Sequence, residues 1–127
     1  MGKPDKDNTL QLIIKQEFFD QIIAGTKKEE YREIKPTTEK KLVQLDSEGY
    51  AIEDENGNSM PIRYDYIKFY VGYAKERDWA LVEVIGSHTE MFMDDNDKPI
   101  SYDYNGEKYF AEQIVYHLGN VIEVHRK

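Results

Sequence analysis

Residues 24–35, with the sequence AGTKKEEYREIK, bring cations and carboxylates close together directly after an apolar segment. Within this stretch Lys27, Glu30 and Arg32 follow Gly25 at the spacing G-x-K-x-x-E-x-R. An ammonium and a guanidinium group can bind a phosphate or polarise a carbonyl, and a carboxylate beside them can accept a proton or orient the guanidinium. The same residues could instead form a solvated edge strand, because charge on both faces is typical of an edge.

The faces that these side chains share depend on the secondary structure of residues 28–34. A strand would place Glu30 and Arg32 on one face, with Lys27 at the turn before them. A helix is the alternative, since the segment KKEEYRE contains good helix formers. The Gly-Thr pair that precedes it favours a break in the chain, but the pattern is compatible with both structures.

The flanking sequence predicts the elements that position this stretch. Residues 10–15 alternate weakly between apolar and polar and predict a buried strand, and 18–23 have apolar residues at helical spacing. Gly25 is well placed to end that helix. The strongest strand patterns are 66–73 and 79–85, and the second has apolar residues on both faces, as in a central strand.

A second short helix and three hairpins are expected further along the chain. Pro36 followed by two threonines is typical of a helix start. Asn-Gly pairs at 56–57 and 105–106 predict tight hairpins, and the second of these would place Asp103 opposite Lys108 and Tyr102 opposite Tyr109. Gly119-Asn120 predicts a third hairpin turn. We find no internal repeat in the sequence.

Two residues outside the charged stretch are further site candidates. Glu83 is the one charge in the strand 79–85. A buried carboxylate destabilises a fold unless it is paired, so Glu83 either pairs with Lys27 or Arg32 or lies at a mouth open to water. Tyr73 is one of several tyrosines that could stack on a nucleic-acid base, although tyrosine also simply favours strands.

Composition limits the class of protein. A chain of 127 residues fits a single domain, which we expect over residues 9–127 after a flexible segment of residues 1–8. The absence of cysteine favours a cytoplasmic protein, and no apolar run reaches the roughly 18 residues of a membrane span. The histidines lie in separate segments, so we expect no metal site and no cofactor.

The net charge of -8 argues against a general nucleic-acid coat protein. The charge is uneven, because residues 1–41 hold nine Lys or Arg against eight Asp or Glu, and the rest hold eight against seventeen. Anions would therefore be attracted to the first third of the chain, which suits one small site better than a long groove.

The segment LIIKQEFFDQIIAGTKKEEYREIKP, residues 12–36, resembles the start of ASCH domains, which belong to the PUA-like superfamily. The mark of that family is an apolar strand, a short helix and then G-x-K-x-x-E-x-R. The resemblance implies an α+β fold, namely a small PUA-like β-barrel with two or three short helices flanking a cleft. It also implies binding of RNA or a modified nucleotide or nucleoside in that cleft. Together with the strand patterns, it gives the candidate ligand-binding residues Gly25, Thr26, Lys27, Glu30, Arg32, Tyr73 and Glu83.

Whether the protein is an enzyme is left open by the sequence. A hydrolase acting on RNA or an acylated nucleoside would use Glu30 as general base and Lys27 to stabilise developing negative charge. One bacterial branch of the family removes the acetyl group of N4-acetylcytidine with a Lys, a Thr and a Glu. Lys27 matches that lysine, but Glu30 stands at the position of the threonine. A third hypothesis is a protein-interaction domain that uses an acidic face.

Overall fold

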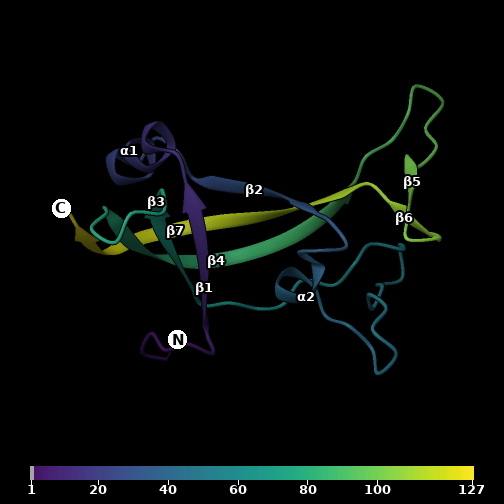
Figure 1. The fold of residues 1–127 in the computed structure, drawn as a ribbon, viewed down its shortest axis with the longest axis horizontal. Helices are drawn as coiled ribbons and strands as arrows, with labels where there is room; N and C mark the ends of the chain where they lie inside the picture. The colour runs from purple at the N-terminus through teal and green to yellow at the C-terminus, as the bar shows by residue number, and fades with distance from the viewer. Residues whose placement is uncertain (1) are drawn as a thin grey trace. The chain divides into compact units, whose positions relative to one another are not determined.

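The structure, a computed structural model, describes residues 2–127, which form seven strands and two helices (Figure 1). This β-rich arrangement with few helices agrees with the predicted α+β class. The elements are β1 (Thr9–Ile14), α1 (Gln16–Ala24), β2 (Glu29–Ile34), α2 (Glu39–Leu42), β3 (Tyr66–Val71), β4 (Trp79–Met91), β5 (Ser101–Tyr104), β6 (Glu107–Phe110) and β7 (Glu112–His125).

Five of the strands form one sheet in the order β1-β3-β4-β7-β2, and β5 pairs with β6 in a separate sheet. Strand β1 runs parallel to β3, with Leu12 beside Phe69, and β3 runs antiparallel to β4, with Phe69 beside Ala80. Within residues 2–127 the order begins at β1 and ends at β2, so the strand order is that of an open sheet, and the expected closed β-barrel is not found.

The chain divides into two compact units. The first unit comprises residues 2–30, Arg63–Gly86 and Tyr116–Lys127, and the second comprises Tyr31–Ile62 and Ser87–Val115. Strands β2, β4 and β7 therefore contribute residues to both units. The first unit holds eleven Lys or Arg against eleven Asp or Glu, and the second holds six against fourteen. The whole net charge of -8 thus belongs to the second unit.

The core of the first unit is built from β1, α1, β3 and β4. The alternation predicted for residues 10–15 is confirmed, because every second residue of β1 from Leu10 to Ile14 is buried. Helix α1 contacts β3 and buries Phe19 and Ile22, whereas Phe18 on its other side is 38% exposed. The strands β3 and β4 add the fully buried side chains Ile67, Phe69, Ala80 and Val82.

The second unit has a smaller core, made of Ile34, Leu42, Val43, Ile114 and Val115. The predicted second short helix is confirmed as α2. Its N-cap is Thr38, and its apolar residue Leu42 is buried.

Two of the three predicted hairpins are confirmed. Strands β5 and β6 pair with Asp103 beside Lys108 and Tyr102 beside Tyr109, as expected. The turn at 56–57 joins Glu53 and Ser59 in a β-bridge.

The third predicted hairpin is wrong, because β7 continues without a turn from Glu112 to His125. A Cβ atom at Gly119 would lie 2.8 Å from Ile85 Cγ2 and 3.3 Å from Glu83 Cβ. The glycine therefore permits close contact between β7 and β4, which is a common reason for glycine inside a strand.

One turn geometry occurs three times in the second unit, in the segments DSEGY, DENGN and DDNDK. In each, the first aspartate accepts hydrogen bonds at Oδ1 from the backbone N of the residues two and four positions later, at 2.8 to 3.0 Å. The fourth residue has positive φ, which favours Gly or Asp there. The sequence therefore does contain a short local repeat; its aspartates are Asp46, Asp54 and Asp94.

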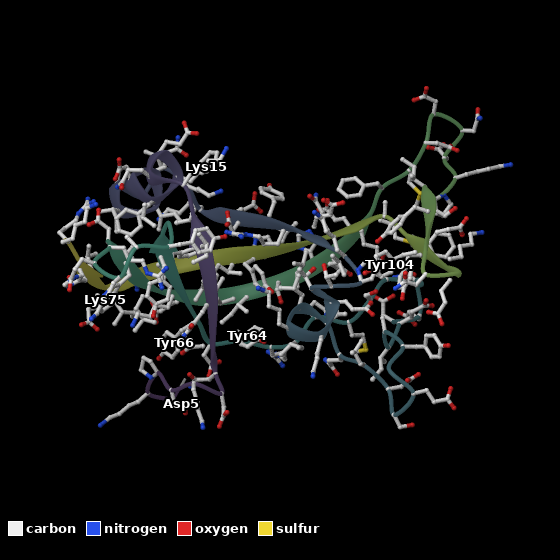
Figure 2. The ribbon with its side chains drawn as sticks, in the orientation of Figure 1. Asp5, Lys15, Tyr64, Tyr66, Lys75 and Tyr104 are labelled. Carbon is white, nitrogen blue, oxygen red and sulfur yellow. The ribbon has the colours of Figure 1, made fainter. Side chains whose placement is uncertain are left out.

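The N-terminal residues of the first unit are tied to β3. Figure 2 shows Tyr66 close to the segment that carries Asp5, and the Tyr66 hydroxyl donates a hydrogen bond to Gly2 O at 2.6 Å. Asp5 Oδ1 also accepts from the backbone N of Asp7 and Asn8 at 2.8 and 2.9 Å. Met1 lies outside the described residues, and the flexibility expected for residues 1–8 stays a prediction.

Asp78, directly before β4, holds the two residues that follow β7 in place. Its carboxylate accepts hydrogen bonds from Lys127 N at 3.0 Å, Arg126 Nη1 at 3.1 Å and Gln16 Nε2 at 3.4 Å. These donors, above all the backbone N of Lys127, lower the pKa of Asp78 below its ordinary value, although burial opposes them.

We therefore expect Asp78→Asn to lower the free energy of unfolding at neutral pH. An acid with a lowered pKa in the folded state stabilises the fold above its unfolded-state pKa, and that stabilisation is lost as the pH falls through the folded-state pKa. The deficit of the variant should therefore shrink towards zero in acid. Urea unfolding of parent and variant at pH 7 and pH 3 measures it, and an equal deficit at both pH values would contradict this explanation.

Candidate functional site

The loop between α1 and β2 carries the predicted site residues Gly25, Thr26 and Lys27, and Glu30 follows near the start of β2. Gly25 ends α1 in the left-handed region, at φ 79°, and its N donates to Ile22 O at 3.1 Å. The backbone N of Thr26 and of Lys27 both donate to Gln21 O, at 3.0 and 3.2 Å. These hydrogen bonds fix the turn of the chain at the end of α1. They therefore also fix the position at which the motif residues after Gly25 lead into β2.

Lys27 and Glu30 form an ion pair at this loop, with Nζ and Oε1 3.2 Å apart. Their side chains are only 17% and 7% exposed. Lys27 Nζ also donates to Glu29 O at 2.7 Å and lies 5.5 Å from the centre of the Phe18 ring. The ammonium group is thus fixed between a carboxylate, a carbonyl and an aromatic ring.

The charged segment after the loop forms a strand, as one of the two sequence readings expected. Its faces differ in burial, because Glu30 and Ile34 are buried whereas Tyr31 and Glu33 are exposed. Strand β2 is the last strand in the sheet order. Glu30 is nevertheless buried, which differs from the solvated edge strand that the sequence also allowed.

A second polar contact involves the residue next to Glu30, and the sequence did not indicate it. His117 Nδ1 on β7 is 3.2 Å from Glu29 Oε2. Next to it, Leu118 N donates to Lys28 O at 2.9 Å and joins β7 to the start of β2. The turn predicted at 119–120 would have paired residues 113–118 with the residues that follow the turn. The sequence therefore did not predict the pairing of β7 with the start of β2.

The other predicted residues lie elsewhere. Arg32 follows Glu30 by two residues on β2 and is half-buried, and it belongs to the second unit. Tyr73 is 86% exposed in the connection between β3 and β4. Glu83 on β4 accepts a hydrogen bond at Oε1 from Asn120 N at 3.1 Å, so its carboxylate helps to hold β7 against β4.

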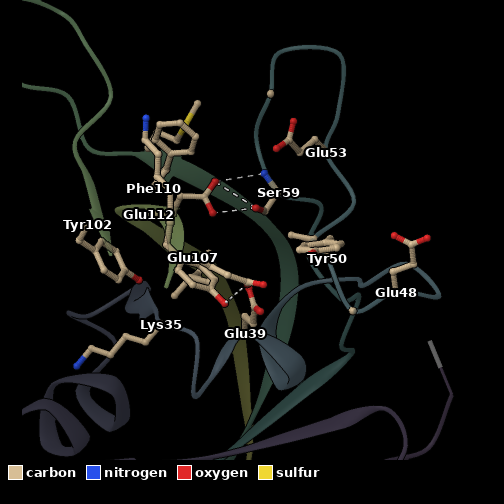
Figure 3. A pocket seen from close by; sticks show the side chains of 17 residues that line it. Lys35, Glu39, Glu48, Tyr50, Glu53, Ser59, Tyr102, Glu107, Phe110 and Glu112 are labelled. Carbon is tan, nitrogen blue, oxygen red and sulfur yellow. Dashed lines mark hydrogen bonds between the residues drawn. The ribbon is translucent and has the colours of Figure 1, made fainter. Parts of the chain in front are cut away.

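The second unit contains a pocket of about 320 Å³ (Figure 3). Tyrosine rings and glutamate carboxylates from α2, the turns, β5, β6 and β7 line it. Sequence reasoning missed this pocket because its residues come from distant segments, none of which has a distinctive pattern. The lining residues include Glu39, Tyr50, Ser59, Tyr102, Glu107, Tyr109, Phe110 and Glu112.

The pocket has a negative electrostatic character. Burial raises the pKa of Glu39, and the charges of Glu112 and Glu107 raise it further. Burial and nearby glutamates likewise raise the pKa of Tyr102 and Tyr109. Like charges that crowd together disfavour the ionised form, so the pocket is a site that would gain from a bound cation.

We expect Glu39→Gln to increase the free energy of unfolding at neutral pH. An acid whose pKa is raised in the folded state destabilises the fold as the pH rises through the interval between the unfolded-state and folded-state pKa values. The gain should therefore be absent in acid and present at pH 7. Urea unfolding across this range measures it, and a variant that is less stable than the parent at pH 7 would contradict it.

Comparison of the chain with protein-family models, with curated proteins and with solved structures finds no match. Neither helix of residues 2–127 has the length and apolar character needed to cross a membrane.

Proposed function

We propose that this protein is an RNA- or nucleotide-binding domain of the ASCH kind, with its binding loop at residues 25–30. The observation that carries the proposal is the Lys27–Glu30 ion pair at 3.2 Å, which is largely withdrawn from solvent. Burying an ion pair seldom stabilises a fold, so a chain that keeps one has a reason other than stability. Recognition of an anionic ligand by a fixed ammonium group is such a reason.

Phe18 supports the same proposal. Its ring is 38% exposed, and the Lys27 ammonium lies 5.5 Å from its centre. Lys28 is exposed next to Lys27. An exposed ring for base stacking beside cations for the phosphate is the usual arrangement in proteins that bind single-stranded nucleic acid. Arg32 is proposed as the second cation of the motif, because it stands at the arginine position of the G-x-K-x-x-E-x-R spacing.

The PUA-like architecture is part of this proposal. It is supported by the order strand, helix, strand over β1, α1 and β2, with the motif at the second junction, as in the resemblance stated above. A cytoplasmic location, expected from the lack of cysteine, is proposed with it.

Binding of a fluorescently labelled single-stranded RNA of mixed sequence, measured by anisotropy at several salt concentrations, tests the proposal. We expect Lys27→Met to weaken binding about tenfold and to reduce the salt slope by about one. Lys75→Met, an equal change of charge at an exposed position of the first unit, is the matched control and should bind like the parent. Phe18→Leu should weaken binding without changing the salt slope.

Equal binding by the parent, Lys27→Met and Arg32→Ala would overturn the proposed site. Circular dichroism on every variant separates loss of binding from loss of fold. If the control weakens binding as much as Lys27→Met, the interaction depends only on total charge and the loop has no special part in it.

A hydrolase is the second candidate, favoured by the contact between the Glu30 carboxylate and the Lys27 ammonium. Glu30 would take a proton from water or a ribose hydroxyl, and Lys27 would stabilise the negative charge that develops. Incubation with short RNAs and acylated nucleosides, followed by chromatography, tests for turnover. Products formed by the parent but not by Glu30→Gln would establish the enzyme, whereas RNA binding by both without any product would exclude this candidate.

A further inference from the structure

We infer that the pocket of the second unit is a docking site for a basic segment of a partner protein, with an arginine or lysine side chain inserted between its aromatic rings and carboxylates. This inference does not depend on the proposed function, because it concerns other residues and another kind of ligand.

Aromatic rings provide the walls. Tyr102 and Tyr109 are stacked with ring centres 5.9 Å apart. Tyr50 and Phe110, which Figure 3 labels on the pocket lining, are 56% and 44% exposed. Exposed aromatic rings of this kind are the surfaces on which guanidinium and ammonium groups stack.

The pocket already shows this chemistry within the chain. Lys108, which lines the pocket, places its Nζ 5.3 Å from the centre of the Phe110 ring. Because Lys108 is exposed, its side chain can move aside for a cation that enters from a partner.

Carboxylates provide the charge. Glu39, Glu107 and Glu112 line the pocket, and burial raises the pKa of Glu39, with a further rise from the charges of Glu112 and Glu107. Glu112 is held in place by the Ser59 hydroxyl, which donates to its Oε2 at 2.8 Å, while Thr89 Oγ1 donates to Ser59 O at 2.6 Å. A cation bound here would replace repulsion with attraction, at a carboxylate whose position is already fixed.

Charge complementarity identifies the partner as basic. The second unit holds six Lys or Arg against fourteen Asp or Glu, and so carries the whole excess of negative charge. A protein segment fits better than a small amine, because the same unit exposes large apolar side chains that a neighbouring chain could cover. These are Ile52, Met60, Phe92, Met93 and Ile100, each between 37% and 49% exposed.

The test is binding of a nine-residue probe peptide, GSGRGRGSG, to the full chain, followed by amide chemical shifts in ¹⁵N-labelled protein. The glutamine counterpart, GSGQGQGSG, controls for the peptide backbone. We expect the arginine probe to shift amides of the pocket, and the double variant Glu39→Gln/Glu107→Gln to weaken binding about tenfold. The matched control Glu55→Gln/Asp95→Asn removes the same charge from exposed turns outside the pocket, and should bind within about twofold of the parent.

Tyr102 gives a second readout that does not alter charge. Tyr102→Phe keeps the ring and should bind like the parent, whereas Tyr102→Leu should weaken binding several-fold. Lys27→Met should leave peptide binding unchanged, so that failure of the RNA-binding proposal and failure of this one can be told apart.

Four results would overturn the inference. They are no shift with the arginine probe, equal shifts with the glutamine counterpart, equal weakening by the pocket variant and its matched control, and binding of spermidine at equal ionic strength without binding of the probe. The last result would assign the pocket to a free amine instead of a protein partner.

Discussion

Replacement of Lys27 by methionine is expected to lower the free energy of unfolding by about 3 kcal/mol, because it removes one partner of an ion pair whose Glu30 carboxylate is buried. Glu30 is 7% exposed and stands 3.2 Å from the Lys27 ammonium, so water cannot readily replace that partner. Methionine keeps the length of the lysine side chain, and the change therefore reports on the charge instead of the packing. Urea unfolding at pH 7 measures the effect.

A double-mutant cycle makes this result specific. Lys27→Met combined with Glu30→Gln should be more stable than Lys27→Met alone, because the buried carboxylate that Lys27 neutralises is then removed together with the lysine. Lys28→Met is the matched control, since it removes an exposed lysine one position away and should change stability by less than about 0.5 kcal/mol. If the double variant is as unstable as the sum of the single ones, the two side chains do not interact in solution.

Replacement of Phe19 by alanine is expected to lower the free energy of unfolding by about 4 kcal/mol, the usual loss for a fully buried phenylalanine. Phe19 has no exposed surface, and the Arg126 guanidinium lies 5.0 Å from its ring centre. The side chain holds α1 in place and, through it, the loop that carries Lys27. Thermal or urea unfolding measures the loss.

Phe18 supplies the control for this prediction, because it is the same residue type one position away on the same helix. Its ring is 38% exposed, and Phe18→Ala should lower the free energy of unfolding by only about 1 kcal/mol. RNA affinity should change in the opposite order. Among molecules that remain folded, Phe18→Ala should lose more RNA affinity than Phe19→Ala. Equal stability losses for the two variants would mean that α1 buries a different face.

The sequence predicted the parts of the fold whose signals are local. The spacing of Phe19 and Ile22 and the position of Gly25 define α1, and the Asn-Gly pair at 105–106 defines the register of β5 and β6. The continuity of β7 through Gly119 was not predictable, because it depends on contact with Ile85, which is distant in sequence. A glycine beside an asparagine gives the same local signal in a turn and at a close strand contact.

The same distinction explains what was predicted of the candidate sites. Gly25, Thr26, Lys27 and Glu30 are neighbours in sequence, so a motif could bring them to attention together. His117 joins Glu29 only through the pairing of β7 with β2, and the pocket of the second unit is assembled from segments up to nearly eighty residues apart. Neither the contact between His117 and Glu29 nor the pocket has a sequence pattern that predicts it before the strand order is known.

The division of three strands between the two units has a consequence for synthesis on the ribosome. The second unit has all its residues once Val115 has been made, whereas the first must wait for Tyr116–Lys127 to supply the final part of β7. Synthesis therefore completes the residues of the acidic unit before it supplies Leu118, whose backbone N pairs with Lys28 O in the loop that carries Lys27. Because the chain passes between the units at four places, neither can be released from the other by a single cut or expressed as one uninterrupted fragment.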